Sequence, residues 1–352
     1  MSAGFSVAIV GATGAVGAEL LQLLEQREFP LRGLKLLASS RSVGKVLKFK
    51  GEETPVEAVS NEAFRGVDVA FFSAGAGTSR EFAHTAVNAG AIVIDNSSAF
   101  RMEPEVPLVV PEINPDDIRA HKGIIANPNC TTIISLMALY PLHRAFRIRR
   151  VIAASYQAVS GAGAKAIREL SDQTKSFFSG ELSVPVVFPH SIAFNVLPQV
   201  DVFLENGYTR EEIKFVNESR KIMHHPTLRA SITCVRVPVF RAHSVAIHAE
   251  FEQAVSVQQA RDVLAKFPGL ELVDDPGSKS YPMPLQVAGK NNCQVGRIRA
   301  DLALDNGLAF WVCGDQILKG AALNALQIAE RLGPLPLKGN GPEPTALPVG
   351  GT

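Results

Sequence analysis

The sequence FSVAIVGATGAVG, at residues 5–17, decides the fold of this chain. Residues 5–10 predict a buried strand, the glycines predict a tight turn, and residues 15–26 have the apolar spacing of a helix. Glycine in such a turn lets the backbone approach a pyrophosphate, which binds the N–H groups at the start of the helix. The pattern GxxGxxG is looser than GxGxxG, and a glycine-rich turn can also join a strand to a helix without binding anything. Its position directly between strand and helix favours a dinucleotide site, formed by Gly11, Ala12, Thr13, Gly14, Ala15, Val16 and Gly17.

The same alternation continues along the first 130 residues. Apolar strands are expected at residues 34–38, 69–72, 91–94 and 124–125, and an amphipathic helix at 78–89. Buried strands that alternate with helices are typical of a parallel sheet with helices on both faces. The sequence therefore predicts a doubly wound α/β domain.

The residues after the second strand distinguish NAD from NADP. An NAD-binding domain usually has Asp or Glu there, which binds the ribose 2′-hydroxyl. This chain has Ser39, Ser40 and Arg41 instead. No acid is present to repel a 2′-phosphate, and the guanidinium can pair with one. The sequence thus favours NADP, although an ordinary surface arginine would look the same.

The composition limits the classes of function. The chain has 352 residues, 46% hydrophobic and 20% charged, which fits a globular protein of about two domains. Its 35 basic and 34 acidic residues nearly balance, so we expect no nucleic-acid or membrane partner. No apolar run could span a bilayer, and the N-terminus lacks a signal-peptide pattern. Four scattered cysteines and eight histidines without ligand spacing predict no metal site and a cytoplasmic protein.

The pattern changes after about residue 145. Strands are expected at residues 151–158, 294–302 and 308–312, with two more between 231 and 251, and helices at 164–177, 208–224 and 255–266. This order is typical of an α+β domain with a mostly antiparallel sheet. A final helix is expected at 316–332, and the Pro- and Gly-rich residues 333–352 are expected to be disordered.

The sequence GIIANPNCTT, at residues 123–132, places a cysteine at the start of a helix. A short strand leads into an Asn-Pro-Asn turn, Cys130 follows, and an apolar helix pattern begins at Thr131. Free N–H groups and the dipole at a helix N-terminus favour an anion, so we expect a thiolate at Cys130. Most free cysteines are buried and inert, so its position alone leaves both alternatives open. A thiolate beside a nicotinamide would act on an aldehyde through a thioester.

Six motifs spread along the chain resemble those of aspartate-semialdehyde dehydrogenase. They are PNCTT at 128–132, YQAVSGAG at 156–163, CVRVPV at 234–239, AHS at 242–244, VGRIR at 295–299 and LKGAA at 318–322. The resemblance covers residues 5 to about 332 and is to the bacterial type. It implies an α/β fold with a Rossmann-type NADP-binding domain at residues 1–130, completed by the helix at 316–332. The implied catalytic and dimerisation domain comprises residues 131–315.

The resemblance also implies catalytic roles. Cys130 would be the nucleophile that carries the acyl group, and Gln157 would orient the substrate or the thioester carbonyl. His243 would be the general acid/base that takes the thiol proton, because the pKa of histidine lies near the working pH. The implied cofactor contacts are Ser73, Gly75, Ser160, Gly161 and Gln316.

Further residues would bind the substrate. Arg236 would bind its α-carboxylate, although an internal ion pair would equally explain an arginine in the apolar run 232–240. Glu218 would bind the α-ammonium group. It shares a helix face with Lys214 and Lys221, and such a face can also be a solvated row of salt bridges.

Phosphate would be bound by three groups under the same resemblance. Arg101 would bind the phosphate that attacks the thioester, and Asn129 could assist it. Either Lys214 or Lys221 would also bind phosphate; the sequence does not decide between them, and we prefer Lys214.

The implied activity is the reversible, NADPH-dependent reduction of 4-phospho-L-aspartate to L-aspartate 4-semialdehyde and phosphate by a homodimer. In this family the reaction supplies lysine or diaminopimelate, threonine and methionine synthesis. The nearest rival is N-acetyl-glutamyl-phosphate reductase, whose acylated amine would have no use for Glu218. A non-catalytic NADP-binding sensor is a further alternative, which would form no acyl adduct.

Overall fold

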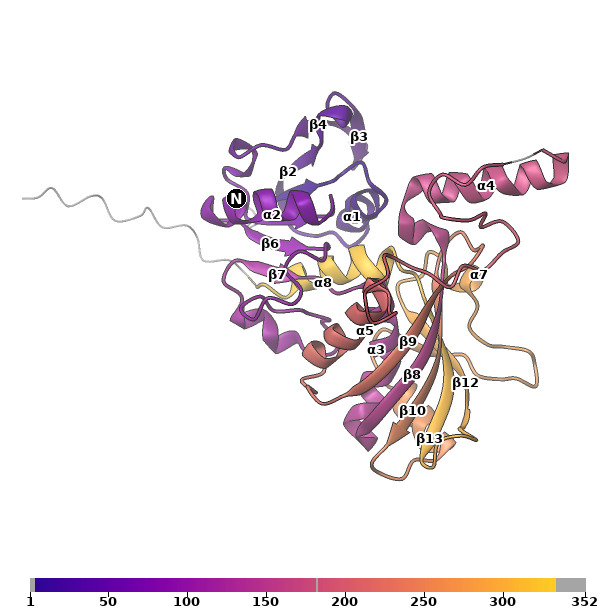
Figure 1. Ribbon diagram of the computed structural model, residues 1–352. Coiled ribbons are helices and arrows are strands. Elements are labelled where there is room, and N and C mark those ends of the chain that lie inside the picture. Colours follow the sequence, from indigo (N-terminus) through magenta and orange to yellow (C-terminus); the bar gives the residue numbers. More distant parts are fainter. Residues whose placement is uncertain (1–3, 182, 334–352) are drawn as a thin grey trace, which may run out of the picture.

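The computed structural model describes residues 4–181 and 183–333, and its first half is a seven-stranded sheet (Figure 1). The strand order is β3-β4-β2-β1-β5-β6-β7, and every neighbouring pair is parallel except the β3–β4 hairpin. The strands are β1 (Phe5–Val10), β2 (Leu31–Ala38), β3 (Val46–Phe49), β4 (Glu52–Ala58), β5 (Val69–Phe72), β6 (Ile92–Asp95) and β7 (Ile124–Ala126).

Helices cover both faces of this sheet. The helices of the structure are α1 (Ala15–Gln26), α2 (Ala76–Asn88), α3 (Cys130–Phe146), α4 (Ala164–Ser179), α5 (Arg210–Ile222), α6 (Val257–Leu264), α7 (Pro284–Val287) and α8 (Leu323–Glu330). Val7 and Ile9 of β1 belong to one hydrophobic cluster with α1 and α8, whereas Ala8 and Val10 belong to another that includes α2. Alternate residues of a central strand are thus buried on opposite sides, as a doubly wound sheet requires. The predicted α/β domain is confirmed.

The second half of the chain forms a six-stranded mixed sheet. Its order is β11-β12-β13-β10-β8-β9, antiparallel in the middle and parallel at the edge pairs β11–β12 and β8–β9. The strands are β8 (Ile148–Gln157), β9 (Arg229–Arg236), β10 (His243–Phe251), β11 (Leu270–Leu272), β12 (Cys293–Ala300) and β13 (Gly307–Gly314). The prediction of a mostly antiparallel sheet is therefore confirmed.

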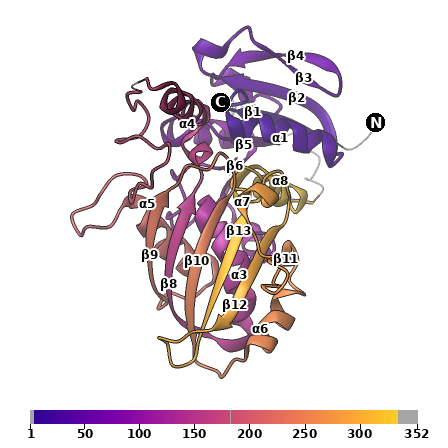
Figure 2. The same cartoon turned by 90° about the vertical axis from the view of Figure 1, so that its right-hand side faces the viewer.

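Helix α3 covers one face of the second sheet. It packs against β8, β10 and β13, and Figure 2 views the sheet from the opposite face. Because α3 begins directly after β7, it leads from the carboxyl edge of the first sheet onto the second. Its first residue therefore lies where the two sheets meet. Across residues 4–181 and 183–333, no helix is both long and apolar enough to cross a membrane.

Two local elements differ from the expectations. The helix expected at 316–332 is divided into a π-helical turn (Leu318–Ala322) and α8. At the start of the turn Asp315 accepts hydrogen bonds from the amides of Ile317 and Leu318, and within it Gly320 packs closely against Cys130. The hairpin of β3 and β4 was not anticipated, since its strands are charged and largely exposed. The expectation of a disordered tail falls on residues 334–352, which lie outside the described residues.

Candidate active site

The predicted catalytic residues come together at one end of the second sheet. Gln157 and Arg236 end the parallel strands β8 and β9 and lie in register. His243 begins the antiparallel strand β10 and therefore lies at the same end. Gln157 Nε2 donates to Thr131 Oγ1 over 2.9 Å, which connects this sheet edge to the start of α3. An imidazole, a guanidinium, an amide and the Cys130 thiol thus share one region.

Cys130 is partly exposed as a residue, and the surroundings of its sulfur favour the thiol over the thiolate. Burial of the sulfur and the charge of Glu211 raise its pKa to about 11, although Arg101 and Arg236 act in the opposite direction. The N–H groups at the start of α3 do little to stabilise a Cys130 thiolate, because the Asn129 side chain already accepts from the amides of Thr131 and Thr132. In the unliganded structure burial and Glu211 thus favour the thiol, in opposition to the effect expected from the helix N-terminus.

Glu211 is a buried carboxylate of the site that the sequence analysis did not single out. Its Oε1 accepts from Asn129 Nδ2 at 2.9 Å and lies 3.4 Å from Gln157 Nε2, and its side chain is buried. It is the carboxylate that raises the pKa of Cys130. The only sequence signal was its place in the first turn of α5, where an acidic residue is ordinary.

Glu218, the residue predicted to bind the substrate ammonium, is occupied by protein partners. Its Oε1 accepts from Arg101 Nη1 at 3.0 Å, and its Oε2 accepts from the Asn129 amide at 2.6 Å. Only 1% of the residue is exposed. Both oxygens of Glu218 are thus used within the protein, whereas Glu211 lies beside Asn129 and Gln157.

Replacing Glu211 tests its effect on the sulfur. Because its negative charge disfavours the thiolate, Glu211→Gln should lower the pKa of Cys130 and increase the thiolate fraction at pH 8. Each unit of pKa lowered should accelerate alkylation by iodoacetamide about tenfold, provided that the thiol remains mostly protonated. Glu205→Gln, which changes an exposed carboxylate, is the control and should alkylate like the unmodified protein. Slower alkylation of Glu211→Gln would contradict this assignment.

His243 is buried and neutral. Its Nδ1 accepts a hydrogen bond from the Ala158 amide at 3.0 Å, which assigns the ring proton to Nε2. Burial, reinforced by the charge of Arg236, lowers its pKa well below 6.5. Its Nε2 has no hydrogen-bond partner within the described residues. The expectation of a pKa near the working pH is therefore wrong for this state, and His243 presents an N–H donor.

The buried neutral His243 should make stability depend on pH. In the unfolded chain the histidine binds a proton below about pH 6.5, whereas the folded ring resists protonation. The free energy of unfolding therefore keeps its full value above pH 6.5 and decreases as the pH falls below it. One such group contributes a loss of about 1.4 kcal/mol between pH 7.5 and 5.5. Urea unfolding at both pH values should show a smaller loss in His243→Gln. The exposed His190, changed to Gln, should keep the original dependence; the reverse pattern would refute the assignment.

Arg236 is a buried cation without a carboxylate partner among the described residues. Its Nη1 donates to the Ala158 carbonyl at 2.7 Å, and the guanidinium lies 5.9 Å from the centre of the Phe188 ring. Only 6% of the residue is exposed. The internal ion pair considered from the sequence is absent from residues 4–181 and 183–333. An arginine held in this way is suited to a bound anion.

The Phe188 loop is fixed by α4. Glu169 accepts from the amides of Val186, Val187 and Phe188, and Gln173 fixes the next turn through Ile192. These buried side chains explain how an irregular, proline-containing segment can cover Arg236. These contacts could not be predicted from the sequence, because their partners lie about twenty residues apart.

The two candidate phosphate lysines differ in their contacts. Lys221 Nζ donates to three carbonyl oxygens, those of Arg101, Glu103 and Val106, at 2.7–2.9 Å. Three donors are all that an ammonium has, so Lys221 holds the loop after Arg101. Lys214 Nζ contacts Asp201 at 2.9 Å and Glu211 at 3.1 Å, and its side chain is 20% exposed. Lys214 therefore keeps a donor for a ligand.

Arg101 is more constrained than the sequence suggested. Its Nε donates to the Asn127 carbonyl, Nη2 to the Asn96 carbonyl and Nη1 to Glu218, at 2.8–3.0 Å. These bonds use three of the five N–H groups of a guanidinium and leave two for an anion.

The glycine turn fits a dinucleotide. Gly11 has φ +91°, and a Cβ there would come within 2.9 Å of the Ser73 backbone. A Cβ on Gly17 would lie 2.3 Å from the Gly11 carbonyl oxygen. Within the described residues no side chain caps α1, so its first N–H groups are available to a pyrophosphate. Gly75, with φ +92°, begins α2 beside open space.

The other predicted cofactor residues occupy two regions. Ser39, Ser40 and Arg41 are exposed at the start of a 3₁₀ turn (Ser40–Ser42) after β2, where a 2′-phosphate would be reached. Ser160 and Gln316 are buried and hydrogen-bonded to each other. Gly161 borders the catalytic groups, because a Cβ there would lie 2.9 Å from Arg236 Nη1 and 3.3 Å from the His243 ring.

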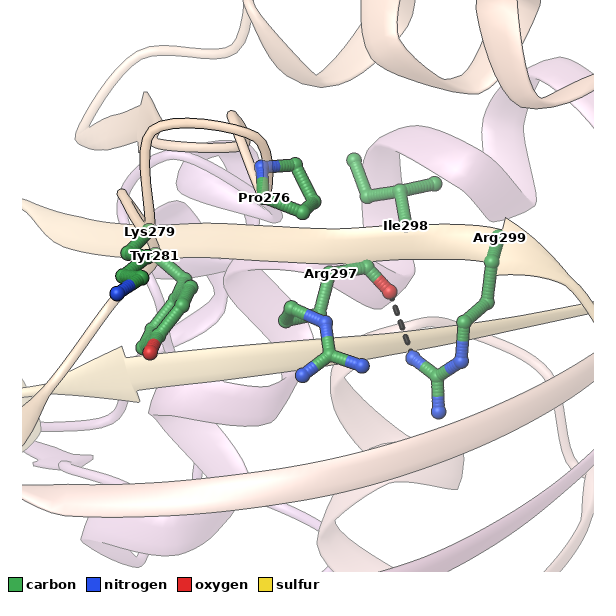
Figure 3. A pocket seen from close by; sticks show the side chains of 6 residues that line it. All are labelled: Pro276, Lys279, Tyr281, Arg297, Ile298 and Arg299. Carbon is green, nitrogen blue, oxygen red and sulfur yellow. Dashed lines mark hydrogen bonds between the residues drawn. The ribbon is translucent and has the colours of Figure 1, made fainter.

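A separate concave region lies beside β12, away from this site. It has a volume of about 430 Å³ and is lined by Pro276, Lys279, Tyr281, Arg297, Ile298 and Arg299 (Figure 3). It includes neither the thiol nor the imidazole of the candidate active site. Three residues of the VGRIR motif, Arg297, Ile298 and Arg299, line this region.

A dinucleotide turn in one domain, with a cysteine, a histidine and a buried arginine together in the other, is the combination expected of a nicotinamide-dependent dehydrogenase that acts through a thioester. Residues 6–121 match the NAD-binding domain of semialdehyde dehydrogenases, and residues 139–319 match their dimerisation domain. The chain belongs to the aspartate-semialdehyde dehydrogenase family, which confirms the resemblance seen in its motifs.

Relatives of similar length support this membership. The aspartate-semialdehyde dehydrogenase of Aquifex aeolicus is 53% identical over 94% of this chain and 98% of the relative, and that of Bacillus subtilis is 48% identical over the same shares. A crystal structure of aspartate semialdehyde dehydrogenase II from Vibrio cholerae, complexed with ASA, superposes with a TM-score of 0.91. It is 44% identical and covers 94% of this chain and 98% of that one.

Proposed function

We propose that this chain catalyses the NADPH-dependent, reversible reduction of 4-phospho-L-aspartate to L-aspartate 4-semialdehyde and phosphate. The observation that carries the substrate assignment is Arg236, a buried cation without a carboxylate partner in the described residues, beside Glu211 and Cys130. An amino acid supplies both complementary charges, its α-carboxylate for Arg236 and its α-ammonium for Glu211.

Substrate binding also offers a route to the thiolate. An ammonium group beside Glu211 would neutralise the charge that raises the pKa of Cys130. The pKa would then fall, because Arg101 and Arg236 continue to favour the anion. The nucleophile is thus activated in the presence of its substrate.

The acyl transfer balances with the residues present. The sulfur of Cys130 attacks the acyl carbon, the carbon–oxygen bond to phosphate breaks, and the thiol proton leaves on hydrogen phosphate. The Nε2–H of His243 donates to the oxygen that becomes negative, and Arg101 and Lys214 bind the departing phosphate. NADPH, when bound, supplies a hydride to the thioester carbon. Collapse of the resulting oxyanion, to which His243 donates a hydrogen bond, breaks the carbon–sulfur bond and releases the aldehyde. The Cys130 thiolate then takes a proton from solvent.

NADP is preferred to NAD in this proposal. Arg41 is exposed after β2, and positions 39 and 40 are serines and not acidic residues.

The four cysteines are free thiols, which supports the proposed cytoplasmic location. The match of residues 139–319 to the family's dimerisation domain supports a homodimer. We place the boundary of the two domains between residues 130 and 131. The product would serve lysine or diaminopimelate, threonine and methionine synthesis.

The substrate assignment is tested by mixing the protein and NADPH with one acyl phosphate at a time. Absorbance at the nicotinamide band should fall with 4-phospho-L-aspartate and remain constant with N-acetyl-glutamyl phosphate. Mass spectrometry without NADPH should find an aspartyl adduct on Cys130. Turnover of the acetylated compound alone would reject the proposal, and the lack of any adduct would support a non-catalytic role.

A further inference from the structure

Arg241 lies two residues before His243 and binds carboxylates from two distant parts of the chain. Its Nη2 is 2.7 Å from Oε1 of Glu19 on α1, and its Nε donates to Oδ2 of Asp315 over 2.6 Å. The Arg241 and Glu19 side chains are 30% and 18% exposed, and Asp315 is fully buried. Partly buried pairs are screened less than exposed ones, so this bridge has more influence than most surface ion pairs.

Asp315 fixes the segment that touches the nucleophile. Besides Arg241, its Oδ2 accepts from the Gly289 amide, and its Oδ1 accepts from the amides of Ile317 and Leu318. These bonds shape the π-helical turn, in which a Cβ on Gly320 would lie 2.8 Å from Cys130 Cβ. The Asp315 carboxylate thus connects Arg241 to the π-helical turn that packs against Cys130.

The residue between Arg241 and His243 is strained. Ala242 has φ +73°, a left-handed conformation that costs an L-residue free energy. Its amide donates to Gln316 Oε1 over 2.8 Å, and Gln316 also donates to Ser160. Such a conformation persists only where contacts hold it, and here they come from Arg241 on one side and Gln316 on the other.

We propose that Arg241 is a positioning residue that ties the cofactor-binding helix α1 to the strained backbone that carries His243. The inference rests on the catalytic role proposed for His243. Because α1 begins at the glycine turn for the pyrophosphate, one guanidinium connects the cofactor domain with the imidazole. Without it, Ala242 can relax and carry Nε2 of His243 away from the reacting oxygen.

The decisive variant is Arg241→Gln. We expect kcat to fall about 10- to 100-fold, since a displacement of about 1 Å at a catalytic group has this effect, while KM for 4-phospho-L-aspartate changes less than about threefold. Arg241→Lys keeps the charge without the fork and should have an intermediate kcat. Glu19→Gln removes only the ion pair between Arg241 and Glu19 and keeps the pair with Asp315. The double variant Arg241→Gln with Glu19→Gln should have the kcat of Arg241→Gln alone, because both changes remove one bridge.

Arg27→Gln is the matched control. Arg27 also connects the end of α1 to the C-terminal helix, through Glu330 at 2.6 and 2.8 Å, but it lies away from His243. It should keep kcat within about twofold of the unmodified protein, because the loss of a partly exposed ion pair within the cofactor domain is expected to have little effect.

The outcomes separate this inference from the proposed function. If folded Arg241→Gln behaves like Arg27→Gln, or its effect adds to that of Glu19→Gln, the positioning role is rejected. If Arg241→Gln does not fold, an unchanged kcat in Arg241→Lys rejects it equally. If His243→Gln remains fully active, the role proposed for His243 itself is wrong, whatever Arg241 does.

Discussion

Cys130→Ser is expected to reduce kcat by about 10⁴-fold or more, with NADPH binding unchanged. A serine hydroxyl ionises far less readily than a thiol, and this site gives it no strong base, because His243 holds its proton on Nε2. Removing a nucleophile typically costs this much, since no other group can carry the acyl intermediate. Turnover is measured with saturating NADPH and 4-phospho-L-aspartate, and cofactor binding is measured by fluorescence titration.

The control for this variant is Cys313→Ser. Cys313 is a buried cysteine beside Ser244 and serves no proposed catalytic role. It should retain kcat within about threefold, if the fold persists, since the change replaces one small buried side chain by another. Substantial activity in Cys130→Ser would remove Cys130 as the nucleophile.

Arg236→Met should separate activity from stability. We expect kcat/KM for 4-phospho-L-aspartate to fall about 10³-fold, because losing one partner of a buried charge pair costs about 2–5 kcal/mol. The loss should appear mainly in KM, since the substrate carboxylate is bound before and during the reaction. The free energy of unfolding should not decrease, because the unliganded protein loses a buried cation that has no carboxylate partner in its described part.

Arg229→Met provides the comparison within the same strand. Arg229 begins β9 and is exposed, so its removal should leave both kcat/KM and unfolding nearly unchanged. Steady-state kinetics and urea unfolding of both variants give the four values needed. A large loss of stability in Arg236→Met, with substrate affinity retained, would mean that Arg236 is structural.

The elements that the sequence predicted well are those whose signals are local. The strand, glycine turn and helix at residues 5–26 were correctly placed, because hydrophobic alternation and glycine conformations act within a few residues. The β3–β4 hairpin was missed, since its charged, exposed strands show no such pattern.

The charged residues of α5 show what local sequence patterns cannot predict. Glu211 and Glu218 are seven residues apart, so both could face the same side of the helix. Only the packing against Asn129 and Arg101 distinguishes the carboxylate near the thiol from the one that is fully bound. Lys214 and Lys221 show the same limit, because their spacing says nothing about which carbonyls lie within reach.

The sequence by itself determined the doubly wound domain, the cysteine at the head of α3 and the membership of the chain in its family. Those features depend on neighbouring residues and on the order of the motifs, and both are visible in the amino-acid sequence without a structure. Tertiary structure alone decided the charge state of Cys130, the proton position on His243 and the bridge from Glu19 to Asp315. Electrostatic effects depend on burial and on distances of a few ångströms between residues far apart in the chain, and folding sets both.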